Sequence, residues 1–215
     1  MRHGAALQDG TRRFTATGLI QNHRILLSRL FAAGFFGVVL TMSPRLEGSV
    51  ASGVLFFSGL ALVGVATVGR LWCSLYISGQ KDSSLVTVGP YSITRNPLYL
   101  FSFLGFTGVG LATETVTLSL VMPLFFALVY PWIIRREEAF LHERFGAAYA
   151  GYCERVPRFL PRPSLYTEPA RWIVDTRRFR RTMVDVVWFV WLVALIELVE
   201  ELHERGVAEP LYTLF

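Results

Sequence analysis

Residues 98–112, LYLFSFLGFTGVGLA, and residues 116–134, VTLSLVMPLFFALVYPWII, are two apolar runs joined only by Thr113, Glu114 and Thr115. Neither run carries a charged side chain, and the second approaches the roughly 20 helical residues that cross a bilayer. A link this short joins neighbouring antiparallel helices. The sequence therefore predicts a helical hairpin in a membrane.

Further apolar runs lie at residues 25–42, 50–77 and 183–199. The second of these is rich in glycines that suit close helix packing, namely Gly53, Gly59, Gly64 and Gly69. The last contains Asp185 and Glu197, so it either spans the membrane or packs on a partner helix. The pattern predicts an all-α, polytopic helical membrane protein with about five transmembrane helices.

The composition excludes a soluble globule, a disordered chain and a disulfide scaffold. Hydrophobic residues make up 53% of the chain, charged residues only 17%, and the mean hydropathy is +0.44. Cys73 and Cys153 are too few for a disulfide framework, and no Cys/His spacing indicates a metal site. The net charge of +5 is concentrated beside apolar runs, which favours an anionic membrane face over nucleic acid as its partner.

Arginines mark one side of the predicted membrane protein. They occur in residues 1–24, at Arg95 after Lys81, and eleven times in residues 135–181, whereas the hairpin tip holds only Glu114. Because Lys and Arg stay on the cytoplasmic side, the N-terminus and residues 135–181 are expected there. The Arg-rich, Lys-poor composition favours a bacterial inner membrane.

The first polar stretch that could bind a ligand covers residues 85–99. Asn96 followed by Pro97 predicts a helix start, with Asn96 as the N-cap. Unpaired N–H groups at that start, next to Arg95, would attract a carboxylate or phosphate. The alternative is a capped membrane helix with an arginine that reaches the interface.

The second stretch, residues 135–161, continues the second helix of the hairpin. Glu138, Leu141, His142 and Phe145 share one face at helical spacing. The hairpin brings this stretch back to the start of its first helix. A carboxylate at the end of the second helix would then face the start of the first helix, which favours anions. Such an arrangement suits a zwitterionic ligand, although a solvated helix with Arg–Glu pairs has the same pattern.

Several motifs occur in a fixed order over residues 81–163. They are Gly89-Pro90-Tyr91, Arg95-Asn96-Pro97-Leu98-Tyr99, Arg135-Arg136-Glu137-Glu138, Phe145-Gly146, Tyr149 with Tyr152, and Val156-Pro157 to Pro161. In this order they resemble the integral membrane methyltransferases that include isoprenylcysteine carboxyl methyltransferases and phospholipid N-methyltransferases. Asn96 stands where that family has His, which keeps a cap and an amide donor but removes a cationic imidazolium.

The resemblance implies an S-adenosylmethionine-dependent methyltransferase with a cytoplasmic cofactor site. The acceptor would be a lipophilic small molecule or lipid entering from the bilayer, with a carboxylate, thiol or amine. The implied cofactor contacts are Leu85, Val88, Gly89, Pro90, Tyr91, Arg95, Asn96, Tyr99, Glu137, Glu138 and Leu141. Arg95 and Glu138 are also the expected catalytic residues, and Tyr149 and Arg158 are expected to contact the acceptor.

On this interpretation the chain has four parts. They are a cytoplasmic tail (1–24), N-terminal membrane helices (25–80), the methyltransferase core (81–163), and a C-terminal linker with a membrane or partner-binding helix (164–215). Two other functions share features of the sequence. One is an NADPH-dependent membrane reductase of the sterol-reductase type, and the other is a non-catalytic membrane adaptor that binds a partner through residues 164–215.

Overall fold

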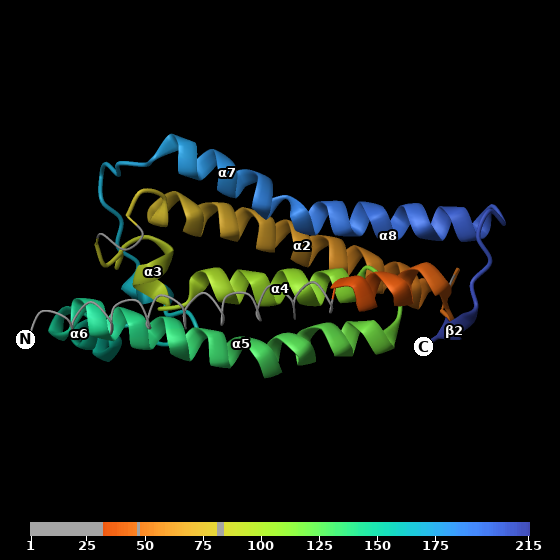
Figure 1. Cartoon of the computed structure of the whole chain (residues 1–215), viewed down its shortest axis with the longest axis horizontal. Coiled ribbons are helices and arrows are strands. Elements are labelled where there is room, and N and C mark those ends of the chain that lie inside the picture. Colours follow the sequence, from red (N-terminus) through yellow and green to blue (C-terminus); the bar gives the residue numbers. More distant parts are fainter. Residues whose placement is uncertain (1–31, 47, 81–83) are drawn as a thin grey trace, which may run out of the picture.

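The computed structural model describes residues 32–46, 48–80 and 84–215, so the expected tail and the start of the first apolar run lie outside the described residues. Long helices lie side by side along one axis (Figure 1). After a helix at Ala32–Thr41, the elements are β1 (Met42–Pro44), α2 (Val50–Ile77), α3 (Pro90–Ile93), α4 (Pro97–Leu111), α5 (Val116–Phe145), α6 (Ala147–Arg155), a 3₁₀ turn (Pro163–Leu165), α7 (Thr176–Val186), α8 (Trp188–Glu204) and β2 (Tyr212–Leu214).

The predicted hairpin is confirmed as α4 and α5. Thr115 caps α5, because its hydroxyl oxygen accepts a hydrogen bond from the Leu118 N–H at 3.3 Å. The second helix of the hairpin continues without a break to Phe145, as expected, and ends at Gly146 with φ 50°. Its last turns therefore extend past the start of α4, which places both polar stretches at one end of the molecule.

Glycines bring α2 and α4 into backbone contact. A Cβ on Gly59 would lie 2.6 Å from the Gly108 carbonyl oxygen, and a Cβ on Gly108 would lie 2.7 Å from that of Gly59. Gly69 likewise packs against the ring of Phe101. The same expectation for Gly53 and Gly64 is wrong, because nothing lies within 4 Å of a Cβ at either position.

Among the residues that the structure describes, three helices are long and apolar enough to cross a membrane, namely Val50–Ile77, Val116–Phe145 and Thr176–Glu204. The shorter apolar helices are Ala32–Thr41 and Pro97–Leu111. The chain is thus an all-α polytopic membrane protein. The run expected at 183–199 belongs to the third of these helices, which the structure divides into α7 and α8 at Val187.

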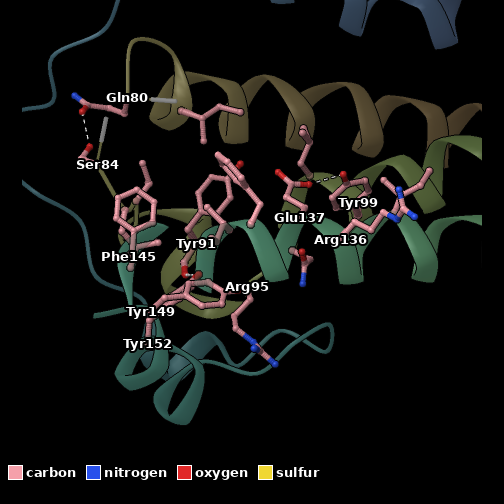
Figure 2. Close-up of a pocket in the computed structure, with 18 of the residues that line it drawn as sticks. Gln80, Ser84, Tyr91, Arg95, Tyr99, Arg136, Glu137, Phe145, Tyr149 and Tyr152 are labelled. Atoms are coloured by element: carbon pink, nitrogen blue, oxygen red, sulfur yellow. Dashed lines mark hydrogen bonds between the residues drawn. The ribbon is translucent and has the colours of Figure 1, made fainter. Parts of the chain in front are cut away.

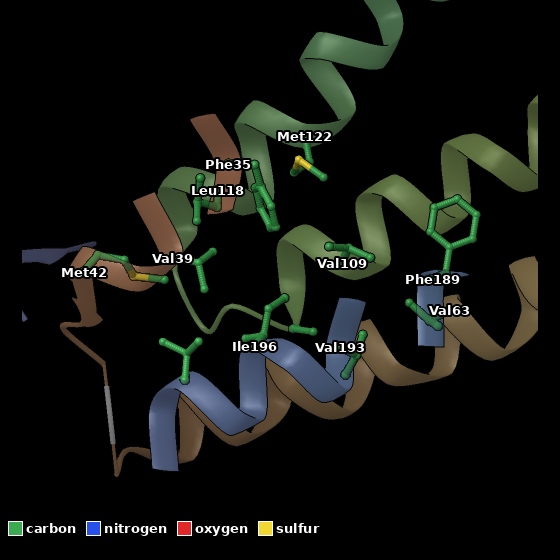
Figure 3. Packing of buried hydrophobic residues seen from close by; sticks show 12 residues of the cluster. Phe35, Val39, Met42, Val63, Val109, Leu118, Met122, Phe189, Val193 and Ile196 are labelled. Carbon is green, nitrogen blue, oxygen red and sulfur yellow. The ribbon is translucent and has the colours of Figure 1, made fainter. Parts of the chain in front are cut away.

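The first apolar run ends as a helix at Thr41, one residue before the expected boundary. Met42–Pro44 instead pairs in parallel with Tyr212–Leu214, since both segments are extended and lie at the same end of the bundle. This end also holds the main hydrophobic core, where Phe35, Val39, Met122 and Ile196 meet (Figure 3). The opposite end holds α3 and α6 (Figure 1), and there the polar stretches gather.

Candidate functional site

The turn before α3 depends on a glycine. Gly89 has φ 61°, a conformation that favours glycine, and an added Cβ would lie 2.6 Å from ring atoms of Tyr76 in α2. Its N–H donates to the Thr167 carbonyl oxygen at 2.8 Å. The turn is therefore held between α2 and the segment that follows α6.

Asn96 occupies the N-cap position of α4, but its side chain makes no capping hydrogen bond. Instead its Nδ2 donates to Glu138 Oε1 at 3.0 Å and to the Arg158 carbonyl oxygen at 3.1 Å. The expectation of side-chain capping is wrong, because the buried amide finds two acceptors on other segments. Asn96 therefore ties the start of α4 to α5 and to the segment after α6.

Glu138 is the centre of this network. Arg158 binds its carboxylate with two nitrogens, Nη2 to Oε2 at 2.8 Å and Nε to Oε1 at 3.2 Å. Arg95 Nη1 lies 3.8 Å from Oε1. A two-nitrogen arginine–carboxylate pair is strong and geometrically defined, so Glu138 aligns three separate segments of the chain.

Arg95 is held on two sides. Its Nη1 donates to Cys153 Sγ at 2.8 Å, and its backbone N–H donates to the Pro157 carbonyl oxygen at 2.8 Å. Its Nε is buried and has no hydrogen-bond partner among the described residues. Sequence analysis did not predict Cys153 as a site residue, because its contact with Arg95 forms only when α6 folds back toward the segment before α4.

A cavity of about 670 Å³ opens beside this network. The predicted site residues that line it are Leu85, Tyr91, Arg95, Asn96, Tyr99, Glu137, Leu141 and Tyr149. Those outside its lining are Val88, Gly89, Pro90, Glu138 and Arg158. The other lining residues, which the sequence did not predict as site residues although the motifs contain Leu98, Arg136, Phe145 and Tyr152, are Ile77, Gln80, Ser84, Val86, Leu98, Trp132, Ile133, Arg136, Phe140, Phe145 and Tyr152. Four of these, Trp132, Ile133, Phe140 and Phe145, are apolar residues of α5.

Glu137 and Tyr99 bridge the hairpin at the cavity wall. The Tyr99 hydroxyl donates to Glu137 Oε2 at 2.5 Å (Figure 2). At the other end of the same cavity the Ser84 hydroxyl donates to Gln80 Oε1 at 2.7 Å. A carboxylate on α5 thus faces a cavity that also holds Arg95.

Tyrosines enclose the rest of the cavity. The Tyr152 hydroxyl donates to the Tyr91 carbonyl oxygen at 2.7 Å. Burial raises the pKa of the Tyr91, Tyr149 and Tyr152 phenols, so these rings stay neutral near pH 7. Among the described residues, the charged side chains that line the cavity are therefore those of Arg95, Arg136 and Glu137.

The segment after α6 covers the site from outside. Glu168 accepts hydrogen bonds from the hydroxyls of Tyr76 at 2.7 Å and Tyr166 at 2.8 Å. Trp172 Nε1 donates to the Tyr76 carbonyl oxygen at 3.2 Å. Residues 166–172 lie outside the sequence motifs, yet they contact Tyr76, the α2 residue that packs against Gly89. Across the described ranges, no three His, Cys, Asp or Glu residues are grouped so that they could hold a metal ion.

Known proteins match both the core and the whole chain. The phospholipid methyltransferase family model matches residues 67–148. A cobalt-zinc-cadmium resistance protein of Cupriavidus metallidurans is 40% identical over 99% of this chain and 95% of its own length. A nickel-cobalt-cadmium resistance protein of Alcaligenes xylosoxydans xylosoxydans is 40% identical over 79% of each chain.

More distant relatives are named as methyltransferases. A probable protein-S-isoprenylcysteine O-methyltransferase of Oryza sativa subsp. indica is 28% identical over 73% of this chain and 86% of its own length. No solved structure matches the chain significantly. The family model, these relatives and the ordered motifs agree, and the chain belongs to the family of integral membrane methyltransferases that includes the isoprenylcysteine and phospholipid enzymes.

Proposed function

We propose that the protein transfers a methyl group from S-adenosylmethionine to a lipophilic acceptor that reaches the site from the bilayer. The observation that carries the proposal is the cavity at the end of the hairpin, where Arg95, Tyr99 and Glu137 meet. A volume of about 670 Å³ lies within the ~300–1,000 Å³ typical of small-molecule sites. The lining is mainly aromatic and apolar, with few charges, as such sites require.

The residues present fit this cofactor. The buried Arg95 Nε is a donor without a partner in the described part of the chain, which suits a carboxylate. Glu137 offers a carboxylate for an ammonium group, while Leu85, Leu141 and Tyr91 offer apolar and aromatic surface to a purine. When bound, the cofactor supplies an electrophilic methyl group on sulfur.

The chain itself has mainly to orient the reactants and exclude water. Glu138 lies outside the cavity lining and already accepts from Asn96 and Arg158. We therefore assign it a positioning role toward Arg95 and Asn96 in place of the expected catalytic one. An amine acceptor would require a base, and Glu137 is the carboxylate that lines the cavity.

The charge distribution supports a cytoplasmic site, and we place it in a bacterial inner membrane because of the Arg-rich, Lys-poor composition. The end of the molecule with α3 and α6 carries Arg95, Arg136 and Arg158, and α7 begins there with Arg177 and Arg178. In the described ranges the opposite end has fewer arginines, Arg45 and Arg205, and exposes Glu201 and Glu204 on α8. Arginines on one side of a membrane protein favour the cytoplasm for that side.

Calorimetry of the detergent-purified protein with S-adenosylmethionine and its demethylated product tests the proposal directly. We expect both to bind with micromolar to millimolar affinity, and Arg95→Lys to weaken binding. Transfer of isotopically labelled methyl groups to a membrane lipid extract then identifies the acceptor by mass spectrometry. Lack of binding by both compounds at millimolar concentration would refute the proposal.

The metal-resistance names of two relatives add a second candidate, a contribution to growth under metal stress. The supporting observation is 40% identity over nearly the whole chain to the Cupriavidus protein. Growth of a deletion strain in cobalt, zinc or cadmium, complemented with wild type or Arg95→Lys, separates the possibilities. If a variant that is inactive in methyl transfer still restores growth in the metal, the protein contributes to metal resistance as a non-catalytic adaptor.

A further inference from the structure

The two arginines that line the cavity have different surroundings. Arg95 donates to Cys153 and lies near Glu138. The guanidinium carbon of Arg136 lies 4.0 Å from the centre of the Trp132 ring, and no described carboxylate is paired with it. Stacking covers the face of a guanidinium and leaves its N–H edge available. Arg136 can therefore still bind an anion.

Arg136 lies at the end of a row of apolar side chains on the surface of α5. Leu124, Leu128, Trp132 and Arg136 follow one another every fourth residue, so they lie in one row on the helix surface. Leu124 is 56% exposed, Leu128 72% and Trp132 50%. On a membrane helix such side chains contact lipid chains. This row thus connects the apolar surface of α5 with the guanidinium of Arg136, which lies beside Tyr99 and Glu137 (Figure 2).

We infer that Trp132 and Arg136 form a subsite for an amphiphile with an anionic head group, a carboxylate or a phosphate. The apolar chain of this ligand would lie along Leu124 and Leu128. Identification of the ligand as the methyl acceptor rests on the proposed function. Arg158, which the sequence suggested for the acceptor, is instead paired with Glu138 and does not line the cavity.

Charge complementarity supports an anionic ligand. Two arginines and one glutamate line the cavity, which leaves one excess positive charge among the described lining residues. The proposed cofactor adds a sulfonium and an ammonium against one carboxylate. A ligand whose head group is only positive would be repelled by this excess positive charge, whereas an anion would balance it.

Photolabelling of the full chain in phosphatidylcholine vesicles tests the subsite without an activity measurement. Three diazirine alkyl probes share one chain and carry a carboxylate, a phosphate or a trimethylammonium head. We expect one or both anionic probes to label the peptide containing Leu124–Trp132, and their ratio to identify the head group. Arg136→Gln should reduce this labelling about tenfold, because a charge-assisted hydrogen bond is lost.

Arg144→Gln is the matched control. Arg144 is also exposed on α5 and lies over an aromatic ring, at 6.0 Å from the centre of Phe145, but it does not line the cavity. Arg136→Lys should retain part of the labelling, since it keeps the charge and loses the planar group. Equal labelling by the ammonium probe, or equal labelling of Arg136→Gln and Arg144→Gln, would overturn the inference. Failure of cofactor binding in calorimetry would instead refute the proposed function and leave anion-selective labelling standing.

Discussion

Replacing Glu138 by glutamine tests whether this carboxylate organises the site. Its Oε1 accepts from Asn96 and from Arg158 Nε, and its Oε2 pairs with Arg158 Nη2. A glutamine side chain has the same shape but places an NH₂ group where one of these oxygens was. In either orientation that group faces a donor, so at least one hydrogen bond is replaced by a donor–donor contact.

The expected loss of stability is about 2 kcal/mol. Hydrogen bonds to charged groups contribute roughly 1.5–3 kcal/mol, and fully exposed ion pairs roughly 0–1 kcal/mol. The side chain of Glu138 is 17% exposed and that of Arg158 41%, so water compensates only part of the loss. For a chain of this size each kcal/mol shifts Tm by roughly 2–4 °C. We therefore expect Tm in detergent to fall by about 4–8 °C.

A double-mutant cycle distinguishes loss of the Glu138–Arg158 pair from general destabilisation of the fold. Glu138→Gln, Arg158→Gln and the double variant are compared by thermal unfolding, with Glu154→Gln, an exposed carboxylate on α6, as the control. Because both single changes disrupt the same contact, their effects should be non-additive by about 1 kcal/mol or more. Strictly additive losses, or an unchanged Tm for Glu138→Gln, would show that the network does not align these segments.

Three further changes probe separate parts of the site. Arg95→Lys keeps the charge but loses the planar group that holds a carboxylate, so methyl transfer should fall tenfold or more, and full activity of the Lys variant would contradict the anion role. Gly89→Ala should cost roughly 1–3 kcal/mol from the left-handed backbone alone and more from the clash with Tyr76, whereas Gly64→Ala, which has open space, should unfold like wild type. Hydrogen bonds from Tyr76 and Tyr166 lower the pKa of the Glu168 carboxyl, so its stabilising effect is present above the pKa of the unfolded state and is lost as pH falls through the folded-state pKa. The Tm difference between wild type and Glu168→Gln should accordingly shrink between pH 7 and pH 3, and a constant difference would argue against this linkage.

The helical hairpin of the core could be predicted from the sequence without tertiary contacts. Apolar length and the three-residue link before Val116 are local properties that match the extent of α4 and the start of α5. The uninterrupted run into Glu138 matches the continuation of α5 to Phe145. Because a short hairpin leaves its two open ends together, the meeting of Asn96 with Glu138 also follows from sequence. Glycine packing was predictable only as a tendency, since Gly59 faces α4 while Gly64 faces open space.

The partner of each polar side chain was decided by the tertiary structure. The pattern Asn96-Pro97 defines a helix start, but whether the amide caps that helix depends on which acceptors other segments bring within 3 Å, here Glu138 and the Arg158 carbonyl. Arg158 and Arg136 are both arginines beside the motifs, yet the first is bound by Glu138 and the second lines the cavity. Sequence determines which residues share a helix, because periodicity and turn chemistry are local. The rotation of α5 against α4, and the return of residues 157–172 over α2, arise from packing between segments distant in sequence, and these decide which charges remain available to a ligand.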